Sequence, residues 1–134
     1  MESTSLWEVI FHDEFDPEFD SFDVEVQNQL MAAARAVENL GPAADRPHVG
    51  TLGNPQHPNM KELRFDAYRG TQVWRAIFAF DPQRHAIVLV ATAKQGISEQ
   101  QFYKVLLKKA NQRYGSHLNQ LKREAAATAS SRKK

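Results

Sequence analysis

The stretch MKELRFDAYRGTQVWRAIFAFDPQRHAIVLVATAK, residues 60–94, decides the fold. It contains three segments rich in β-branched and aromatic residues, at 61–68, 72–80 and 86–93. Gly70 lies in the first connection between these segments, and the Asp81–Pro82 pair lies in the second. All three are typical turn residues. Short turns of this kind connect neighbouring antiparallel strands, so the stretch is predicted to form a three-stranded meander.

Two arginines lie inside this predicted meander, although arginine rarely enters a sheet without a binding partner. The first is Arg64, between Leu63 and Phe65. Alternation of side chains along a strand places Arg64 on the same face as Glu62 and Asp66. A surface ion pair with these acidic neighbours is therefore one interpretation of Arg64, and binding of an external anion is the other.

The second arginine, Arg75, lies on the strand face opposite an aromatic row. Trp74, Phe78 and Phe80 occupy the bulkier face, which is predicted to be the core. Asp66 could satisfy Arg75 across the hairpin. Lys94 ends the last strand, and if the strand register aligns, three cations meet on one face of the sheet and form a phosphate-binding surface: Arg64, Arg75 and Lys94.

The flanking segments predict one more strand and three helical pieces. Residues 6–11, LWEVIF, have strand composition. Four phenylalanines from residue 11 to residue 22 recur at helical spacing around Pro17, and a second apolar stripe runs to the stop signal Gly41–Pro42. Ser98 opens the last helix, with Gln101 in capping-box register. The prediction is a small α+β fold with an antiparallel sheet, two N-terminal helices and a C-terminal helix, the helices lying on one face.

The chain length and composition fit one domain. The chain has 134 residues, of which 42% are hydrophobic and 25% are charged, as in ordinary globular proteins. Residues 1–122 are predicted to form the domain, and the polar, basic residues 123–134 a flexible tail. Residues 41–60, with four prolines and three glycines, are predicted to form a long surface connection.

Charge is distributed unevenly along the chain, although the net charge is only +1. Residues 1–34 contain nine acidic residues and no lysine or arginine, whereas all 17 basic residues follow them. If the acidic segment does not pack over the basic surface, the remainder presents a patch that attracts phosphates. Mutual neutralisation on a solvated surface is the alternative.

Several classes of protein are not expected. The chain has no cysteine, which excludes a disulfide framework and a thiol nucleophile. The N-terminal sequence has no signal-peptide pattern and no segment is apolar enough to span a membrane, so a cytoplasmic protein is expected. His48 and His57 have no third ligand at metal-binding spacing, and neither a metal nor another cofactor is predicted.

The order and spacing of several short motifs resemble a known family over residues 6–118. The motifs are W.V.F...F..EF, GP, NMKELRF, WRAIFAFDP, AK.G and FYK.L...A..RY..HL. Together they resemble toxins of bacterial type II toxin–antitoxin modules, the RelE/ParE superfamily, and within it the HigB-like branch. The resemblance implies a basic cleft and a ribosome-dependent endonuclease that cuts mRNA. It also implies a cognate antitoxin, commonly with a helix-turn-helix domain, through which the toxin would meet DNA only indirectly.

The same resemblance implies roles for individual residues. Arg64 matches the arginine of the ELR motif, Arg75 that of the WR strand, and Lys94 the lysine that closes the last strand. These three would be catalytic, with arginine stabilising phosphoryl charge and Lys94 a possible base. The predicted RNA-binding residues are Lys61, Arg69, Tyr103 and Tyr114.

Two other functions stay open at this point. Members of the ParE branch inhibit DNA gyrase by binding it, so a non-enzymatic inhibitor is one alternative. A degenerate toxin that acts only as an antitoxin-binding module is the other. The sequence also leaves open the codon preference, the general acid and base, and the oligomeric state.

Overall fold

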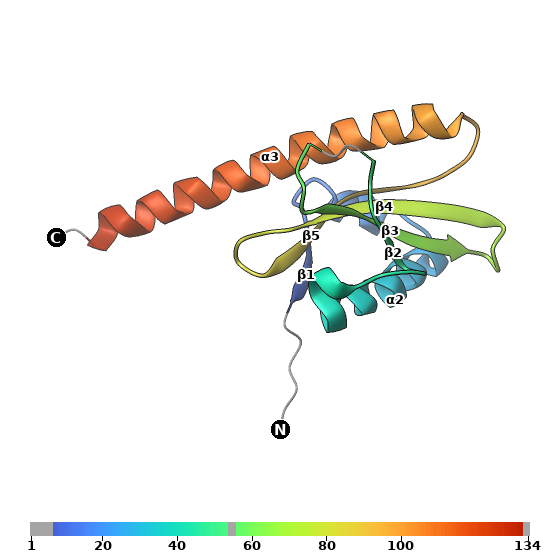
Figure 1. Ribbon diagram of the computed structural model, residues 1–134, viewed down its shortest axis with the longest axis horizontal. Coiled ribbons are helices and arrows are strands. Elements are labelled where there is room, and N and C mark those ends of the chain that lie inside the picture. Colours follow the sequence, from blue (N-terminus) through green and yellow to red (C-terminus); the bar gives the residue numbers. More distant parts are fainter. Residues whose placement is uncertain (1–6, 54–55, 133–134) are drawn as a thin grey trace, which may run out of the picture.

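The computed structural model describes residues 7–53 and 56–132 and contains a five-stranded sheet (Figure 1). The strand order is β1-β5-β4-β3-β2. The predicted meander is confirmed, with antiparallel pairing of β3 with β4 and of β4 with β5. β1 is parallel to β5, so the sheet is mostly rather than wholly antiparallel. The strand bounds are β1 Glu8–Phe11, β2 Val49–Gly50, β3 Met60–Ala67, β4 Gln72–Phe80 and β5 His85–Ala93.

The connection over 41–60 contains more structure than its sequence predicts. A short 3-10 helix, η1 Gly41–Ala43, follows α2, and β2 then pairs with β3 at the sheet edge. Val49 explains this pairing because it is buried, lies opposite Leu63 and contributes to the core. Gly41 ends α2 with φ +57, and a Cβ there would lie 2.3 Å from the Trp7 indole. The contact requires glycine at this position.

Two N-terminal helices precede this connection, as predicted. α1, Asp16–Asp20, begins with Pro17 in its first turn, where a missing N–H costs nothing. α2, Val24–Leu40, buries one stripe of side chains: Val26, Leu30, Ala33, Ala34 and Val37. This stripe packs on the aromatic face of the sheet, together with Phe65, Trp74 and Phe78. The aromatic face is therefore core, as the sequence predicts.

The helices cover both faces of the sheet, and the prediction of helices on one face was wrong. α3, Glu99–Arg132, packs on the face opposite α2, as Figure 1 shows. Phe102, Leu106 and Ala110 of α3 contact Ile77 and Leu89 in a second core. The reason lies in β5, whose side chains are apolar on both faces and would otherwise leave one face exposed.

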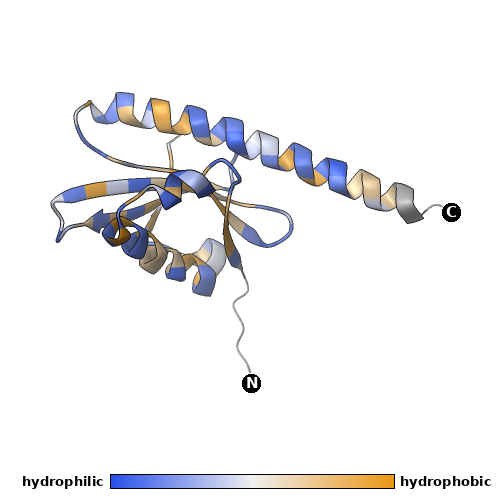
Figure 2. Ribbon diagram, turned by 180° about the vertical axis from the view of Figure 1, so that it is seen from behind, coloured by the Kyte–Doolittle hydropathy of each residue, from blue (hydrophilic) through white to orange (hydrophobic). Residues whose placement is uncertain are grey.

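The predicted start of α3 is confirmed, because the Ser98 hydroxyl accepts a hydrogen bond from the backbone N–H of Gln101 at 3.2 Å. The helix continues through residues 123–132 and projects beyond the sheet (Figure 1). Three consecutive alanines from residue 125 favour this continuation. Figure 2 shows polar and apolar residues alternating along the helix. The division of the chain into a domain and a flexible tail at residue 122 stays a prediction, and residues 133–134 lie outside the described residues.

Among the described residues, the helices are too short or too polar to cross a membrane.

Candidate functional site

The strand register places Arg64 and Arg75 directly opposite each other on β3 and β4. Two like charges in this position repel each other and need a counter-charge. Glu62, which is two residues before Arg64 on the same strand face, supplies it. The Glu62 side chain is only 2% exposed, whereas those of Arg64 and Arg75 are 35% and 16% exposed. A buried carboxylate thus lies between two partly accessible guanidinium groups.

Glu62 divides its two oxygens among three partners. Its Oε1 accepts a hydrogen bond from Nε of Arg64 at 3.0 Å. Its Oε2 lies 3.4 Å from Nε of Arg75 and accepts a hydrogen bond from the hydroxyl of Tyr103, on α3. One negative charge is therefore shared by two arginines, and the cluster keeps a net positive charge.

Arg75 is incompletely satisfied in this arrangement. Its Nη1 donates to the backbone oxygen of Trp74 at 3.0 Å, but its buried Nε has no hydrogen-bond partner among the described residues. The distance of 3.4 Å to Glu62 is an ion-pair contact rather than a well-formed hydrogen bond. Because Nε is buried, contact with an anion from outside is limited to the exposed part of the Arg75 side chain, which is 16% exposed.

Burial and the neighbouring Glu62 carboxylate raise the pKa of Tyr103 to about 12. Both effects disfavour the phenolate, because it would add a second negative charge in a partly desolvated position. Tyr103 is consequently protonated at neutral pH and acts as a hydrogen-bond donor.

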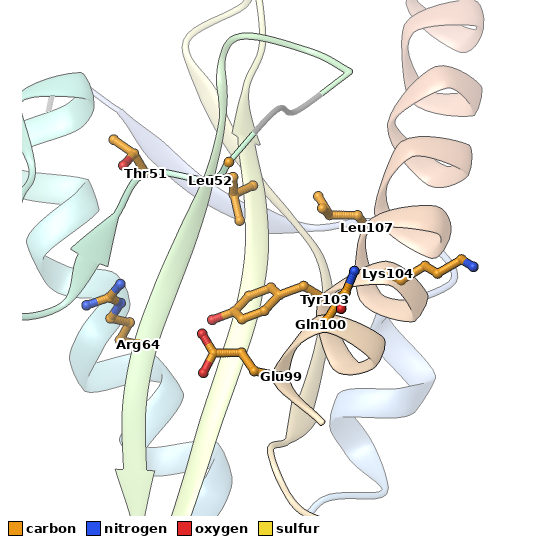
Figure 3. A pocket seen from close by; sticks show the side chains of 9 residues that line it. Thr51, Leu52, Arg64, Glu99, Gln100, Tyr103, Lys104 and Leu107 are labelled. Carbon is orange, nitrogen blue, oxygen red and sulfur yellow. The ribbon is translucent and has the colours of Figure 1, made fainter. Parts of the chain in front are cut away.

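The cluster borders a cleft of about 820 Å³ between the segment 51–53 and the first turns of α3. Figure 3 shows Arg64 of β3 on one side and Tyr103 of α3 on the other, with its hydroxyl directed toward the strands. The cleft is lined by Thr51, Leu52, Gly53, Arg64, Glu99, Gln100, Tyr103, Lys104 and Leu107.

Lys94 lies at the margin of the same cluster. Its backbone N–H donates to the oxygen of Val73 at 2.7 Å, which extends the sheet pairing beyond β5. Its Nζ lies 3.0 Å from Oε1 of Glu99 and 5.8 Å from the centre of the Tyr103 ring. The structure thus brings the three predicted catalytic cations together around Glu62 and Tyr103.

The four predicted RNA-binding residues lie in different surroundings. Tyr103 lines the cleft, and Lys61 lines a second pocket beside it. Arg69 is exposed at the tip of the β3–β4 hairpin with φ 58, and it is absent from the lining of the cleft. Tyr114 is buried in the core, where its hydroxyl donates to the oxygen of Phe80 at 3.0 Å and accepts from Nδ2 of Asn59 at 2.7 Å. Burial also raises the pKa of Tyr114. This position supports a structural role and gives no support to RNA contact.

Sequence reasoning missed Glu62 as the centre of the site. The available signal was that Glu62 lies on the same strand face as Arg64, but Asp66 lies on that face too. The alternative that Asp66 satisfies Arg75 is contradicted, because Asp66 is exposed and Glu62 makes the contact. Glu62 is covered by Tyr103, which is 41 residues away in the chain, and a strand pattern carries no information about that cover.

The acidic N-terminal segment makes its contacts elsewhere. Glu18 forms a two-bond pair with Arg113 of α3, and Glu25 accepts a hydrogen bond from the backbone N–H of Tyr68 at the hairpin tip. The lining of the cleft includes no residue of the segment 13–25. The described part of this segment therefore leaves the cleft cations accessible. The described residues also contain no group of three or more histidine or acidic side chains that could hold a metal ion.

Comparison with known proteins confirms the resemblance inferred from the motifs. A family model described as "Phage derived protein Gp49-like (DUF891)" matches residues 17–115. The chain is 40% identical over 98 residues to "Putative toxin HigB2" of Mycobacterium tuberculosis, a match that covers 73% of this chain and 48% of that protein. It is also 40% identical over 67 residues to "Putative toxin HigB3" of the same organism, covering 50% of this chain and 55% of that protein. The chain spans about half the length of these relatives.

Proposed function

The chain belongs to the Gp49-like family of RelE/HigB-type toxins, and on that premise we propose that it is the toxin of a type II toxin–antitoxin module. Its proposed activity is ribosome-dependent cleavage of mRNA, which inhibits translation. The observation that carries this proposal is the pair of facing arginines around one buried carboxylate, at the edge of an open cleft. Phosphoryl transfer needs positive charge held in place before the reaction begins, and this arrangement provides it.

In the proposed reaction, a ribose 2′-oxygen attacks the adjacent phosphorus and the bond from phosphorus to the 5′-oxygen breaks. Arg64 and Arg75 bind the phosphoryl oxygens and stabilise the charge that develops there. Glu62 accepts the proton of the 2′-hydroxyl at Oε1, the oxygen next to the cleft-lining Arg64, once substrate binding opens access to this buried carboxylate. Tyr103, protonated at neutral pH, holds Glu62 in position through its hydrogen bond.

Lys94 has a different role in this proposal from the base considered on sequence grounds. Its Nζ lies 3.0 Å from Oε1 of Glu99, at the margin of the cluster, where a lysine side chain can donate to a phosphate oxygen. The Lys94 ammonium would stabilise the leaving 5′-oxygen and supply its proton. The atoms balance, since one proton leaves the 2′-hydroxyl and one joins the 5′-oxygen, and no metal or other cofactor takes part.

The proposed partners follow from this activity. The ribosome and translated mRNA are the substrate complex, which places the protein in the cytoplasm. A cognate antitoxin, with DNA contact only through it, would silence the toxin by covering the face that carries Arg64, Arg75 and Lys94. An acidic segment of the antitoxin fits this face because it would compete with RNA phosphate for the same cations.

Primer extension on a translated message tests the function. Expression of the protein without an antitoxin is expected to arrest bacterial growth and to create new 5′ ends within the message. The Glu62→Gln variant keeps the size of the side chain but cannot accept the proton, so it should lose at least about 100-fold in cleavage. Intact mRNA combined with a supercoiling defect would overturn the proposal in favour of gyrase inhibition, and growth without either effect would indicate a degenerate toxin.

A further inference from the structure

A second pocket lies on the other side of Arg64, at the edge of the sheet formed by β2. It has a volume of about 310 Å³. The η1 helix and the segment after it form one wall, and β2 and β3 form the other. The pocket is lined by Pro42, Ala43, Ala44, Asp45, Arg46, Val49, Gly50, Thr51, Lys61 and Arg64.

Positive charge dominates this pocket. Arg46, Lys61 and Arg64 contribute three cations, whereas Asp45 is the single acidic residue in the lining. The Asp45 carboxylate accepts a hydrogen bond from the backbone N–H of Arg46 at 2.6 Å. Among the described residues, neither the Arg46 nor the Lys61 side chain makes an ion pair or hydrogen bond. Two cations are thus available to an anion from outside.

Gly50 joins the pocket to the cleft. The guanidinium of Arg64 lies across β2 at this point, and a Cβ on Gly50 would be 3.0 Å from its Nη2. Because Gly50 has no side chain, Arg64 can approach the backbone closely and line both cavities, as Thr51 also does. β2 is only two residues long, so side chains from both faces of β3 reach the pocket at this edge.

We propose that this pocket binds the RNA phosphate next to the one that reacts in the cleft. The inference rests on the proposed function and extends it to a second phosphate site. Phosphates recur at every nucleotide of a single strand, so a groove that follows the strand needs cations at successive positions. Arg64 is the shared cation, and Arg46 and Lys61 complete the second site.

Amide chemical shifts, titrated with a 2′-O-methyl hexanucleotide, test this inference. The probe has no free 2′-hydroxyl and cannot be cleaved by the proposed reaction. We expect saturable shifts at Gly50, Thr51 and Lys61. Arg46→Ala and Lys61→Ala should each weaken binding by about 3- to 10-fold and reduce the slope of log K against log salt by about 0.7. The matched control is Arg35→Ala on α2, an exposed position on the face opposite α3, where the same loss of charge should leave binding unchanged.

The other outcomes separate the second site from the proposed function. If the wild-type protein binds the probe and both variants bind it equally well, the pocket is not a phosphate site, although cleavage in the cleft can still be correct. Equal binding of a hexaglutamate peptide at the same amides would overturn the RNA assignment and indicate an acidic protein partner. Probe binding at the pocket without cleavage of any translated message would support the pocket and overturn the proposed reaction.

Discussion

Two glutamate–arginine pairs lie beneath α3, and they differ in how completely the arginine is satisfied. In the first pair, Nη1 and Nη2 of Arg113 donate to the two carboxylate oxygens of Glu18 at 2.9 and 2.6 Å. Nη1 also donates to the backbone oxygen of Leu89 at 2.8 Å. In the second pair, Glu62 lies 3.4 Å from Arg75 and is shared with Arg64.

The difference separates a structural ion pair from a candidate reactive one. The two Nη atoms of Arg113 donate to the two oxygens of the Glu18 carboxylate, which is a bidentate pair. This hydrogen bonding raises the pKa of Arg113 and lowers the pKa of Glu18. One guanidinium faces one carboxylate in this pair, so no net positive charge is left to attract an added phosphate. Around Glu62, by contrast, two guanidinium groups share one carboxylate and Nε of Arg75 lacks a hydrogen bond. A substrate phosphate could supply the missing negative charge.

The largest effect on stability is expected for Arg113→Ala. This change leaves the Leu89 oxygen without its donor and removes the charge partner of Glu18. Loss of one member of a buried pair costs about 3 kcal/mol, and we place this variant at that value because Glu18 itself stays partly hydrated. Urea denaturation measures the change in unfolding free energy.

The control for this prediction is Lys109→Ala. Nζ of Lys109 lies 3.9 Å from Oε2 of the same Glu18, but the side chain is about half exposed. Exposed pairs contribute less than about 1 kcal/mol. Equal destabilisation by both variants would mean that Arg113 forms an ordinary surface pair and would remove the contrast between the two glutamate–arginine pairs.

The second prediction concerns activity at the cleft. Arg75→Ala and Lys94→Ala should each reduce mRNA cleavage by about 100-fold, because each removes one contact to a charged reacting group. Arg75→Lys should also fail if Arg75 binds phosphate through two nitrogens. Primer extension measures cleavage, and urea denaturation of the same variants should show little change compared with Arg113→Ala. Full cleavage by both alanine variants would place the reactive site elsewhere.

The sequence predicted much of this arrangement because strand pairing has a simple period. Turn residues set the register of the hairpins, and alternation along the strands then brought Arg64 and Arg75 to one face. The buried stripe of α2 could also be predicted, since apolar residues that recur every 3.6 residues identify the buried side of a helix. These features depend on local spacing and need no knowledge of distant contacts.

The rest depended on which element covers which face. α3 covers the face that carries Arg75, and this cover converts Glu62 from an apparent surface acid into a buried one. The same packing takes Tyr114, which was predicted to bind RNA, into the core. β2 was missed because a two-residue strand has no period to detect, and its pairing is determined by Val49 at the edge of β3.

The smallest expected effect is on the pH dependence of stability, and it arises from the fully satisfied pair. The hydrogen bond from Arg113 lowers the pKa of Glu18 below its usual 4.5. This contribution is present above pH 4.5 and is lost as pH falls through the pKa of the folded state, because the unfolded chain then binds more protons. Glu18→Gln cannot ionise, so its unfolding free energy should fall less than that of the wild-type protein below pH 4.5.

His12 also makes stability depend on pH, because burial lowers its pKa. The stability that neutral His12 contributes starts to be lost as pH falls below 6.5, so this loss begins at a higher pH than the loss from Glu18. Urea denaturation at several pH values measures the difference, with Glu14→Gln as the control because Glu14 is exposed and 3.8 Å from Arg113. Identical acid profiles for Glu18→Gln and the wild-type protein would show that the Glu18–Arg113 pair contributes no more than an exposed one.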